Sequence, residues 1–291
     1  MSNRQVAGDI EVRLAGLRVH PIKSCAGIEV DTALVIETGL EFDRAWMVVD
    51  AQGGFVSQRR LPRMVLVRCA FRHGELLLRA PGMLALHLAL DTVETSCRVR
   101  VWDDEVAAFD MGDLCAQWFS DFLGEPLRVA RFDPDQRRLS ARSWTGAIEA
   151  ENAFADAFPL LVASNASLAE VNLRLHDRGH APVAMERFRP NLVLDGLAAA
   201  HDEDHLDEIE FDAEGGPVRI KLVKPCGRCS IPDVDPAAGV QGEGVGAVLA
   251  AYRADARIDG QSSFGMNAVI VEGIDRVLRV GMAGRASYRF D

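Results

Sequence analysis

The sequence of 291 residues predicts an α+β protein that is mainly β, with a barrel-like N-terminal part followed by a second β-rich part that carries a few packed helices. Short runs of alternating apolar and polar residues fill the first hundred positions, separated by Gly, Asp or Pro. Strand-like runs return after residue 158, between a few helical segments. This length fits one large or two moderate domains, and we do not expect a doubly wound parallel sheet.

The composition is that of a soluble folded protein, with 48% hydrophobic and 26% charged residues. The 43 acidic residues outnumber the 32 basic ones, and the net charge of -11 argues against an extended nucleic-acid interface while allowing a local basic pocket. The start of the chain lacks the apolar core of a signal peptide, and the longest apolar run, "GMLALHLAL", is too short to span a bilayer. We therefore expect a cytoplasmic protein with no nucleic-acid and no membrane partner.

Seven strand-like runs make up the N-terminal part. The two glycines of "DAQGGF" allow the positive φ of a hairpin turn between two of these runs. Short antiparallel runs of this kind predict a meander or a barrel. The runs cover residues 11–20, 27–36, 45–50, 54–60, 64–72, 75–80 and 97–102.

Two helices are expected between and after these strands. Residues 113–124 read as a helix capped by Asp113, with Leu114, Trp118 and Phe122 on one face and Gly124 at the end. Ser167 stands three residues before Glu170, the spacing of a capping box, and predicts a helix over 167–175. The charged, weakly periodic segment 131–152 is interpreted as a passage between domains, a buried strand follows at 158–164, and further strands are expected at 191–196, 208–212, 218–224 and 267–273.

Two segments carry motif-like residues that we interpret as structural. "GEGVGAVLAAYR" (242–253) has no clear strand before it and no Lys-Ser/Thr after it, so it fails the context of a nucleotide loop and predicts a loop entering a core helix. "HDEDHLDE" (201–208) has two histidines among carboxylates, but nothing apolar shields them. We expect a solvated acidic loop there in preference to a metal site.

The stretch "KPCGRCSIPDVDP" (224–236) presents Cys226 and Cys229 three residues apart. A zinc ribbon needs two such pairs and the chain has one, whereas a thioredoxin-like pair precedes a helix that Pro232 would impede. What remains is one accessible thiolate, favoured by Arg228, that could ligate a metal whose other ligands come from elsewhere. Two cysteines packed in a tight loop remain an equal alternative.

Cations at loop ends are the other candidate ligand groups. Lys23 and Ser24 in "VHPIKSCAG" offer a cation, a hydroxyl and backbone N–H groups to a phosphate, although a surface turn has the same composition. Arg189, beside Phe188 in "ERFRPNLVLDG", could bind a charged or heterocyclic ligand through planar hydrogen bonds. Arg44 and Arg59 add cations at either end of the expected hairpin.

These pieces, in this order, resemble the MOSC family, named for the C-terminal domain of molybdenum cofactor sulfurase, together with its N-terminal β-barrel partner. The similar motifs are "VHPIKSCAG", "FDRAWMVVD", "FVSQRRLPRMV", "FPLLVASNASLAEVN", "RFRPNLVLDG", "CGRCSIPDVDPAAG" and "FGMNAVIVEGIDRVLRVGM", from about residue 10 to the end. The resemblance implies a MOSC N-terminal β-barrel domain over 10–130 and a MOSC β-barrel domain with the molybdenum cofactor over 131–291. It extends to the amidoxime-reducing components, which reduce N-hydroxylated compounds.

The resemblance also implies roles for individual residues. Cys229, the second cysteine of the pair, matches the thiolate that binds molybdenum, whereas Cys226 is not carried over as a ligand. Arg228 matches the residue before the metal ligand. The expected cofactor-binding residues, several of which match positions that hold the pterin and its phosphate, are Lys23, Ser24, Arg44, Arg59, Arg189, Asn191, Arg228 and Asn267.

The implied activity is the reduction of a small N–OH substrate to N–H at the molybdenum cofactor. Asp233 or Asp235 is the candidate proton donor, with turn formation as the alternative for both. The chain ends without the ferredoxin cysteine pattern of some bacterial relatives, so we expect a separate electron-donor protein of ferredoxin, flavin reductase or cytochrome type. The alternatives are a sulfur carrier or cofactor-sulfuration protein with a persulfide on Cys229, and a non-catalytic molybdenum-cofactor-binding protein.

Departures from the family pattern concern the same site. A Thr-Ser pair that contacts the cofactor in the amidoxime-reducing enzymes is replaced by Ala157 and Phe158, and a C-terminal tyrosine is replaced by Asn267. If backbone N–H groups make those contacts, the site survives. If hydroxyl groups make them, cofactor affinity or substrate range must differ.

Overall fold

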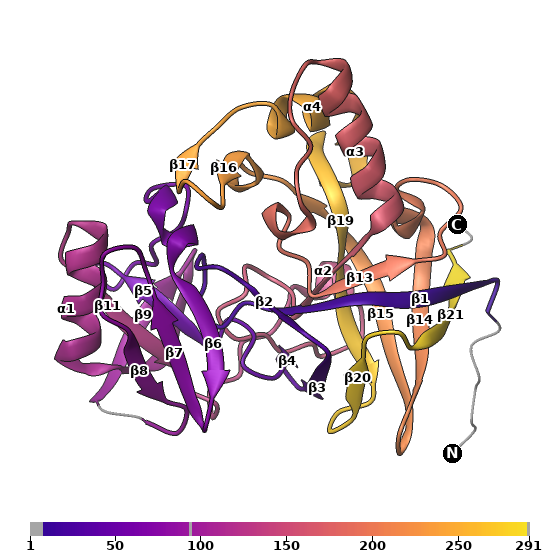
Figure 1. Cartoon of the computed structure of the whole chain (residues 1–291). Helices are drawn as coiled ribbons and strands as arrows, with labels where there is room; N and C mark the ends of the chain where they lie inside the picture. The colour runs from indigo at the N-terminus through magenta and orange to yellow at the C-terminus, as the bar shows by residue number, and fades with distance from the viewer. Residues whose placement is uncertain (1–7, 93–94, 290–291) are drawn as a thin grey trace.

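A closed seven-stranded β-barrel forms the part of the protein that lies on the right in Figure 1. The computed structural model describes residues 8–92 and 95–289. The expectation of no signal peptide concerns the start of the chain, and residues 1–7 lie outside the described residues. The first and last strands of the barrel pair with each other and close it, and the side chains that fill its interior are apolar. In barrel order the strands are β12 (Leu160–Ser164), β13 (Leu192–Asp195), β1 (Ile10–Val19), β21 (Ala283–Tyr288), β14 (Leu206–Ala213), β15 (Gly216–Gly227) and β19 (Gln261–Glu272).

The first strands of the chain are built into this barrel. Strand β1 pairs with both β13 and β21, and β2 (Ile28–Val30) pairs with β1. Strand β3 (Thr32–Ile36) pairs with β4 (Gly39–Leu40) and with β20 (Val277–Arg279), close to the end of the chain. Strand pairing therefore joins the two halves of the sequence, and the domain limits of 10–130 and 131–291 stay a prediction.

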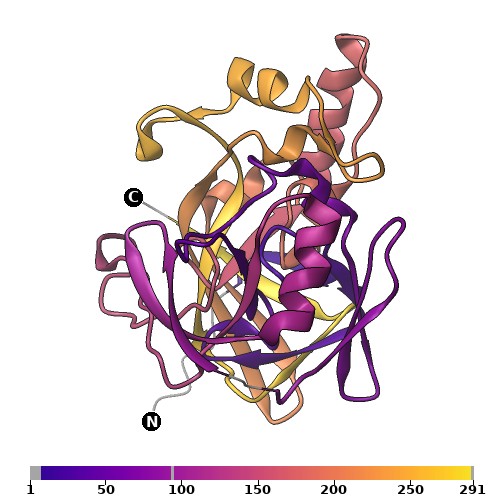
Figure 2. The ribbon, with the colours of Figure 1, turned by 90° about the vertical axis from the view of Figure 1, so that its left-hand side faces the viewer.

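The rest of the N-terminal half forms two smaller antiparallel sheets beside the barrel (Figure 1). Helix α1 (Gly112–Leu123) covers the outer side of this part, as the turned view shows (Figure 2). It buries Cys115, Trp118, Phe119 and Phe122 against a core shared with the sheets. One sheet contains β5 (Trp46–Val49), β11 (Arg128–Phe132), β10 (Asp104–Asp110) and β9 (Thr95–Val101), and the other β6 (Arg68–Arg72), β7 (Glu75–Arg79) and β8 (Leu86–Ala89).

The remaining helices sit on the barrel. Helices α3 (Asn165–Asp177) and α4 (Val245–Tyr252) pack against each other above it, over a core that includes the fully buried rings of Phe188 and Phe264 (Figure 1). No helix in residues 8–92 and 95–289 has the length and apolar character needed to cross a lipid bilayer. The short elements are α2 (Arg142–Thr145), β16 (Val234–Asp235), β17 (Val240–Gln241), β18 (Ala254–Asp255), and the 3₁₀ turns Pro62–Leu66, Met185–Arg187, Asp202–His205, Ile231–Asp233 and Ala256–Ile258.

The prediction of a mainly β, α+β fold with a barrel is confirmed, while several local predictions are wrong. Helix α1 starts at Gly112, whose N–H is bound by the Asp110 carboxylate, so Asp113 does not cap it, and Leu114 is 74% exposed. Helix α3 is capped by Ser164 in place of Ser167, because the helix begins three residues earlier than the capping-box spacing indicated. The expected run at 54–60 makes only isolated bridges at its first two residues.

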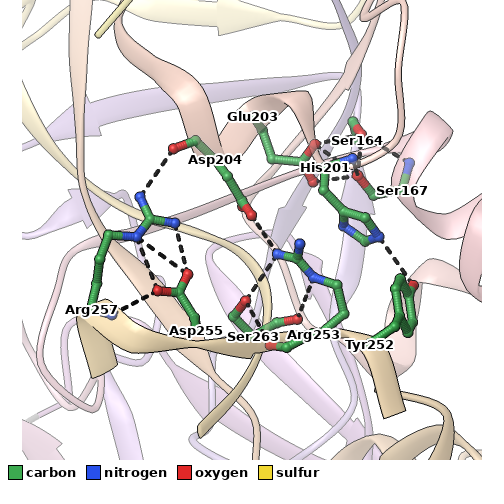
Figure 3. Close-up of polar contacts among 10 residues, drawn as sticks. All are labelled: Ser164, Ser167, His201, Glu203, Asp204, Tyr252, Arg253, Asp255, Arg257 and Ser263. Carbon is green, nitrogen blue, oxygen red and sulfur yellow. Dashed lines mark hydrogen bonds and ion pairs between the residues drawn. The ribbon is translucent and has the colours of Figure 1, made fainter. Parts of the chain in front are cut away.

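The acidic segment 201–208 is the largest correction, because His201, Glu203 and Asp204 are buried, and Figure 3 shows their polar contacts. Glu203 is fully buried and accepts hydrogen bonds from the hydroxyls of Ser164 and Ser167 at 2.7–2.8 Å. Asp204 is 5% exposed and forms an ion pair with Arg253. The partners of these carboxylates come from α3 and from the end of α4, so the pattern within 201–208 could not reveal them.

Candidate functional site

A cavity of about 430 Å³ opens where the loops of the N-terminal part meet one end of the barrel. Nine residues that the sequence identified as candidate ligands line this single cavity. They come from loops that follow β1, β4, β5, β15 and the 3₁₀ turn at 185–187, and from β19. The nine are Lys23, Ser24, Arg44, Arg59, Arg189, Asn191, Arg228, Cys229 and Asn267.

One end of the cavity is a network of buried cations. Asn191 is 1% exposed, and its side-chain oxygen accepts hydrogen bonds from Arg44 (3.0 Å) and from the Leu161 backbone N–H (3.1 Å). Arg44 also donates to the Arg189 carbonyl oxygen (3.0 Å), and Arg189 donates to the Cys25 carbonyl oxygen (2.6 Å). The two guanidinium groups are therefore held in fixed positions by Asn191 and by backbone carbonyl groups.

Backbone conformation also marks this end of the cavity. Ser24, Arg44 and Arg189 have φ values of 67°, 49° and 59°, in the left-handed region that non-glycine residues rarely adopt. Such conformations cost on the order of 1–3 kcal/mol each and persist where the surrounding structure enforces them. Three such residues at one cavity are typical of a functional site, because strained backbone conformations cluster where they serve function.

Burial acts on the charges of this network. It lowers the pKa of Lys23, although the nearby Asp156 carboxylate opposes the effect. Lys23 Nζ donates to Asp156 Oδ1 (2.5 Å) and to the Phe154 carbonyl oxygen (2.7 Å). Burial, with the neighbouring charge of Arg44, lowers the pKa of Arg189 to about 10. A negatively charged ligand at this end would favour the charged forms of both cations.

The candidate thiol lies just beyond the end of β15. Cys229 is exposed, whereas Cys226 is half-buried and its sulfur accepts a hydrogen bond from Arg228 (3.1 Å). The expected end of the strand at Pro225 is wrong, because β15 continues through Pro225 to Gly227 with register shifts on either side of the proline. The structure thus places both cysteines at the cavity, with the second one free to meet a ligand.

The cavity is strongly cationic inside an acidic protein. Seven Lys and Arg side chains line it against two carboxylates, Asp156 and Asp259. Lys23, Arg44 and Arg257 form ion pairs with Asp156, Asp43 and Asp255. The other four, Arg59, Arg189, Lys224 and Arg228, form no ion pair with a carboxylate in residues 8–92 and 95–289.

These residues fit a molybdenum cofactor that brings its own sulfur donors and a phosphate. The exposed Cys229 offers one soft ligand, and the unpaired side chains of Arg59, Arg189 and Arg228 suit the anionic groups. Arg228 Nε is buried with no hydrogen-bond partner, so a donor at the cavity is left for a ligand to use. No three His, Cys, Asp or Glu side chains of the described chain come together in an arrangement that could hold a metal ion.

The structure separates the two candidate proton donors from the cavity. Asp233 accepts hydrogen bonds from the Gly246 N–H in α4 (3.1 and 3.3 Å) and does not line the cavity. Asp235 accepts from the Ala237 and Ala238 N–H groups (2.7 and 3.1 Å), which lower its pKa, and it also lies outside the cavity. The geometry therefore supports the turn-forming alternative for both aspartates.

The residues that depart from the family pattern do lie at the site. Ala157, Phe158 and Asn267 all line the cavity. Phe158 is buried, whereas Asn267 donates a long hydrogen bond to the Pro225 carbonyl oxygen (3.4 Å). All three side chains are uncharged, so they change the shape and polarity of the cavity and not its charge.

Sequence reasoning missed several lining residues. Segment 131–152, interpreted as a passage between domains, contributes Trp144, which lines the cavity, and Arg138, which is 8% exposed. Arg138 donates to the carbonyl oxygens of Ala153, Ala155 and Asp156 at 2.6–3.1 Å and so shapes the loop that meets Lys23. Weak periodicity hid both roles, since they depend on contacts with distant strands.

The fold and this cavity define a β-barrel protein with a site suited to an anionic ligand. Two family models match the chain: the MOSC N-terminal beta barrel domain over residues 11–126 and the MOSC domain over residues 149–283. The chain therefore belongs to the MOSC family, as its motifs predicted.

Proteins similar in sequence to this chain include mitochondrial amidoxime reducing components. Component 2 of Bos taurus is 34% identical over 77% of this chain and 67% of that protein, and component 1 of Homo sapiens is 34% identical over 78% and 67%. Among solved structures, the YUAD protein from Bacillus subtilis covers 96% of this chain and 98% of its own, at 11% identity and a TM-score of 0.46. That structural likeness is too low to inform the function.

Proposed function

We propose that this protein is a molybdenum-cofactor-dependent oxidoreductase that reduces N-hydroxylated compounds. The observation that carries the proposal is the exposed Cys229 thiol in a cavity of seven cations and two carboxylates. The names of the relatives, which are amidoxime-reducing components, support the substrate class. When bound, the cofactor would supply the redox-active metal, and an N–OH group with two electrons and two protons would give N–H and water.

The residues of the chain would bind and orient this group. Lys23, Ser24, Arg44 and Arg189 would hold the anionic phosphate end, since they form the buried cation network. Asn191 would fix the Arg44 guanidinium through its 3.0 Å hydrogen bond. Cys229 would supply the protein's sulfur ligand to the metal.

Other lining residues would complete the pocket. Arg228, held by the Phe188 carbonyl oxygen (2.9 Å), would direct its free Nε–H to the ligand beside the thiol. Arg59 lies over the Trp102 ring (4.7 Å to the centroid) and would close the pocket from the N-terminal part, while Asn267 would face it from β19. Asp233 and Asp235 are not part of the proposal, so protons would reach the substrate from solvent through the open mouth.

The proposed partners follow from the chemistry. A separate electron-donor protein of ferredoxin, flavin reductase or cytochrome type would supply the two electrons, and the substrate would be a small N-hydroxylated molecule. We propose a cytoplasmic location, which cell fractionation would test against the mitochondrial location in the names of the relatives.

The test is to purify the protein from a host that makes molybdopterin and to measure molybdenum, pterin and sulfane sulfur per chain. Stoichiometric molybdenum with reductant-dependent conversion of benzamidoxime to benzamidine would support the proposal. Labile sulfane sulfur without metal would instead support a sulfur carrier or cofactor-sulfuration protein with a persulfide on Cys229. A loaded protein without turnover would indicate a cofactor-binding protein.

A further inference from the structure

The cavity has a second cationic group that the proposed cofactor site does not use. Lys224 on β15 lines the cavity together with Trp144 on α2, and its Nζ lies 5.0 Å from the centroid of the Trp144 ring. Lys224 forms no ion pair with a carboxylate in the described residues. A cation on an aromatic face is held in place without having its charge neutralised. This ammonium group therefore stays available to a negative charge in the cavity.

Strand register places Lys224 far from the buried cation network. The Asn191 N–H donates to the Leu161 carbonyl oxygen (2.8 Å), Leu161 lies opposite Asn267, and Asn267 lies opposite Lys224. All four residues line the cavity, and they form a row across adjacent strands in the order Asn191, Leu161, Asn267 and Lys224. Three steps between strands separate its ends, about 14 Å along the sheet.

A phosphate bound by the buried network, at the other end of this row, would leave the Lys224 ammonium without a partner. The Cys226–Cys229 loop continues β15 beyond Lys224, so the ammonium belongs to the wall next to the proposed metal ligand.

We infer that Lys224, positioned by Trp144, is a specificity-determining residue that recognises a carboxylate or phosphate group on the substrate. The preferred substrates are then small N-hydroxylated compounds that carry a negative charge. This inference rests on the proposed function. Trp144 acts as a positioning residue, because it packs on the buried cluster of Phe158, Val223 and Val269 and holds the ammonium at the wall.

The experiment compares three probes in the loaded enzyme: 4-carboxybenzamidoxime, benzamidoxime and its 4-trimethylammonio derivative. The kcat/KM ratio of the carboxylate probe to the neutral probe is expected to fall about tenfold in Lys224→Gln, mainly through KM, because a hydrogen bond to a charged group is lost. Trp144→Leu should lower the same ratio, while Trp144→Phe, which keeps an aromatic face, should restore most of it. The matched control is Lys221→Gln on the same strand, whose ammonium pairs with Asp207 and Glu208 outside the cavity.

Two further measurements keep the outcomes distinct. Molybdenum and pterin per chain should be the same in Lys224→Gln and wild type, and a proportional loss would assign Lys224 to the cofactor and overturn the inference. Equal losses for all three probes would also overturn it. Binding of 4-carboxybenzamidoxime measured by calorimetry separates the inference from the proposed function: binding that depends on Lys224 supports it even without turnover, and binding that ignores Lys224 refutes it even in an active reductase.

Discussion

The side chain of Asn191 should contribute both to the stability of the barrel and to the order of the cavity. Asn191→Ala removes two hydrogen bonds with backbone groups, to the Leu161 N–H and the Arg18 carbonyl oxygen, and one from the Arg44 guanidinium. About 1 kcal/mol for each neutral bond and about 2 kcal/mol for the charged one give a loss of about 4 kcal/mol in the free energy of unfolding. A domain of ordinary stability, 5–15 kcal/mol, would remain folded at room temperature.

Urea denaturation followed by circular dichroism measures this loss. The control is Asn165→Ala, since Asn165 is exposed and makes one side-chain hydrogen bond, to Asp195 (2.8 Å), whose removal should change the unfolding free energy by about 0.5 kcal/mol or less. In folded Asn191→Ala, the freed Arg44 side chain should also lower the pterin content per chain. Equal destabilisation by the two substitutions would refute the reasoning that the buried network fixes Arg44.

Three further predictions concern single residues. Cys229→Ser should abolish reduction of N–OH compounds while circular dichroism shows an intact fold, and Cys226→Ser should be far milder; equal losses would favour a joint role of the two thiols. Lys23→Ala should lower molybdenum content more than turnover per bound molybdenum, and the reverse result would remove Lys23 from the cofactor site. Burial raises the pKa of Glu203, so its stabilising contribution is present at low pH and falls as pH rises through the raised pKa. Between the ordinary pKa of a Glu carboxyl and the raised pKa of Glu203, the unfolding free energy of wild type should therefore fall relative to that of Glu203→Gln by up to about 1.4 kcal/mol per pH unit, and parallel curves over that range would contradict the prediction.

The local sequence identified nine of the residues that line the cavity, because each belongs to a short motif at a loop or a strand end. Lys23 with Ser24, Arg44, Arg189 and Cys229 were each recognisable beside a strand end, although the sequence alone could not show that the loops converge. The loops converge because β1, β13 and β15 are strands of the same closed barrel. The order of motifs along the chain supplied that information only through resemblance to a family.

Two of the failures, at Glu203 and Trp144, share one physical cause, which is that residues far away in the sequence surround the side chain. Glu203 was expected in solvent, yet two serine hydroxyls of the β12–α3 junction solvate it inside the protein (Figure 3). Trp144 was hidden in a weakly periodic segment, because its packing surface is formed by β15 and β19. A pattern within ten residues can indicate a helix or a strand, but it cannot indicate the tertiary contacts that a side chain makes in the folded protein.

The way in which the cavity holds its cations explains how an acidic protein can maintain a positive site. Arg189 and Arg228, which form no ion pair with a carboxylate among the described residues, each donate a hydrogen bond to a backbone carbonyl oxygen, at 2.6 and 2.9 Å. A carbonyl dipole orients a cation but cancels little of its charge, whereas a carboxylate would cancel it. The positive field is therefore built into the folded backbone before any ligand arrives, at the cost seen in the lowered pKa of Arg189. An anionic ligand would relieve this repulsion, so the same contacts that order the loops would favour its binding.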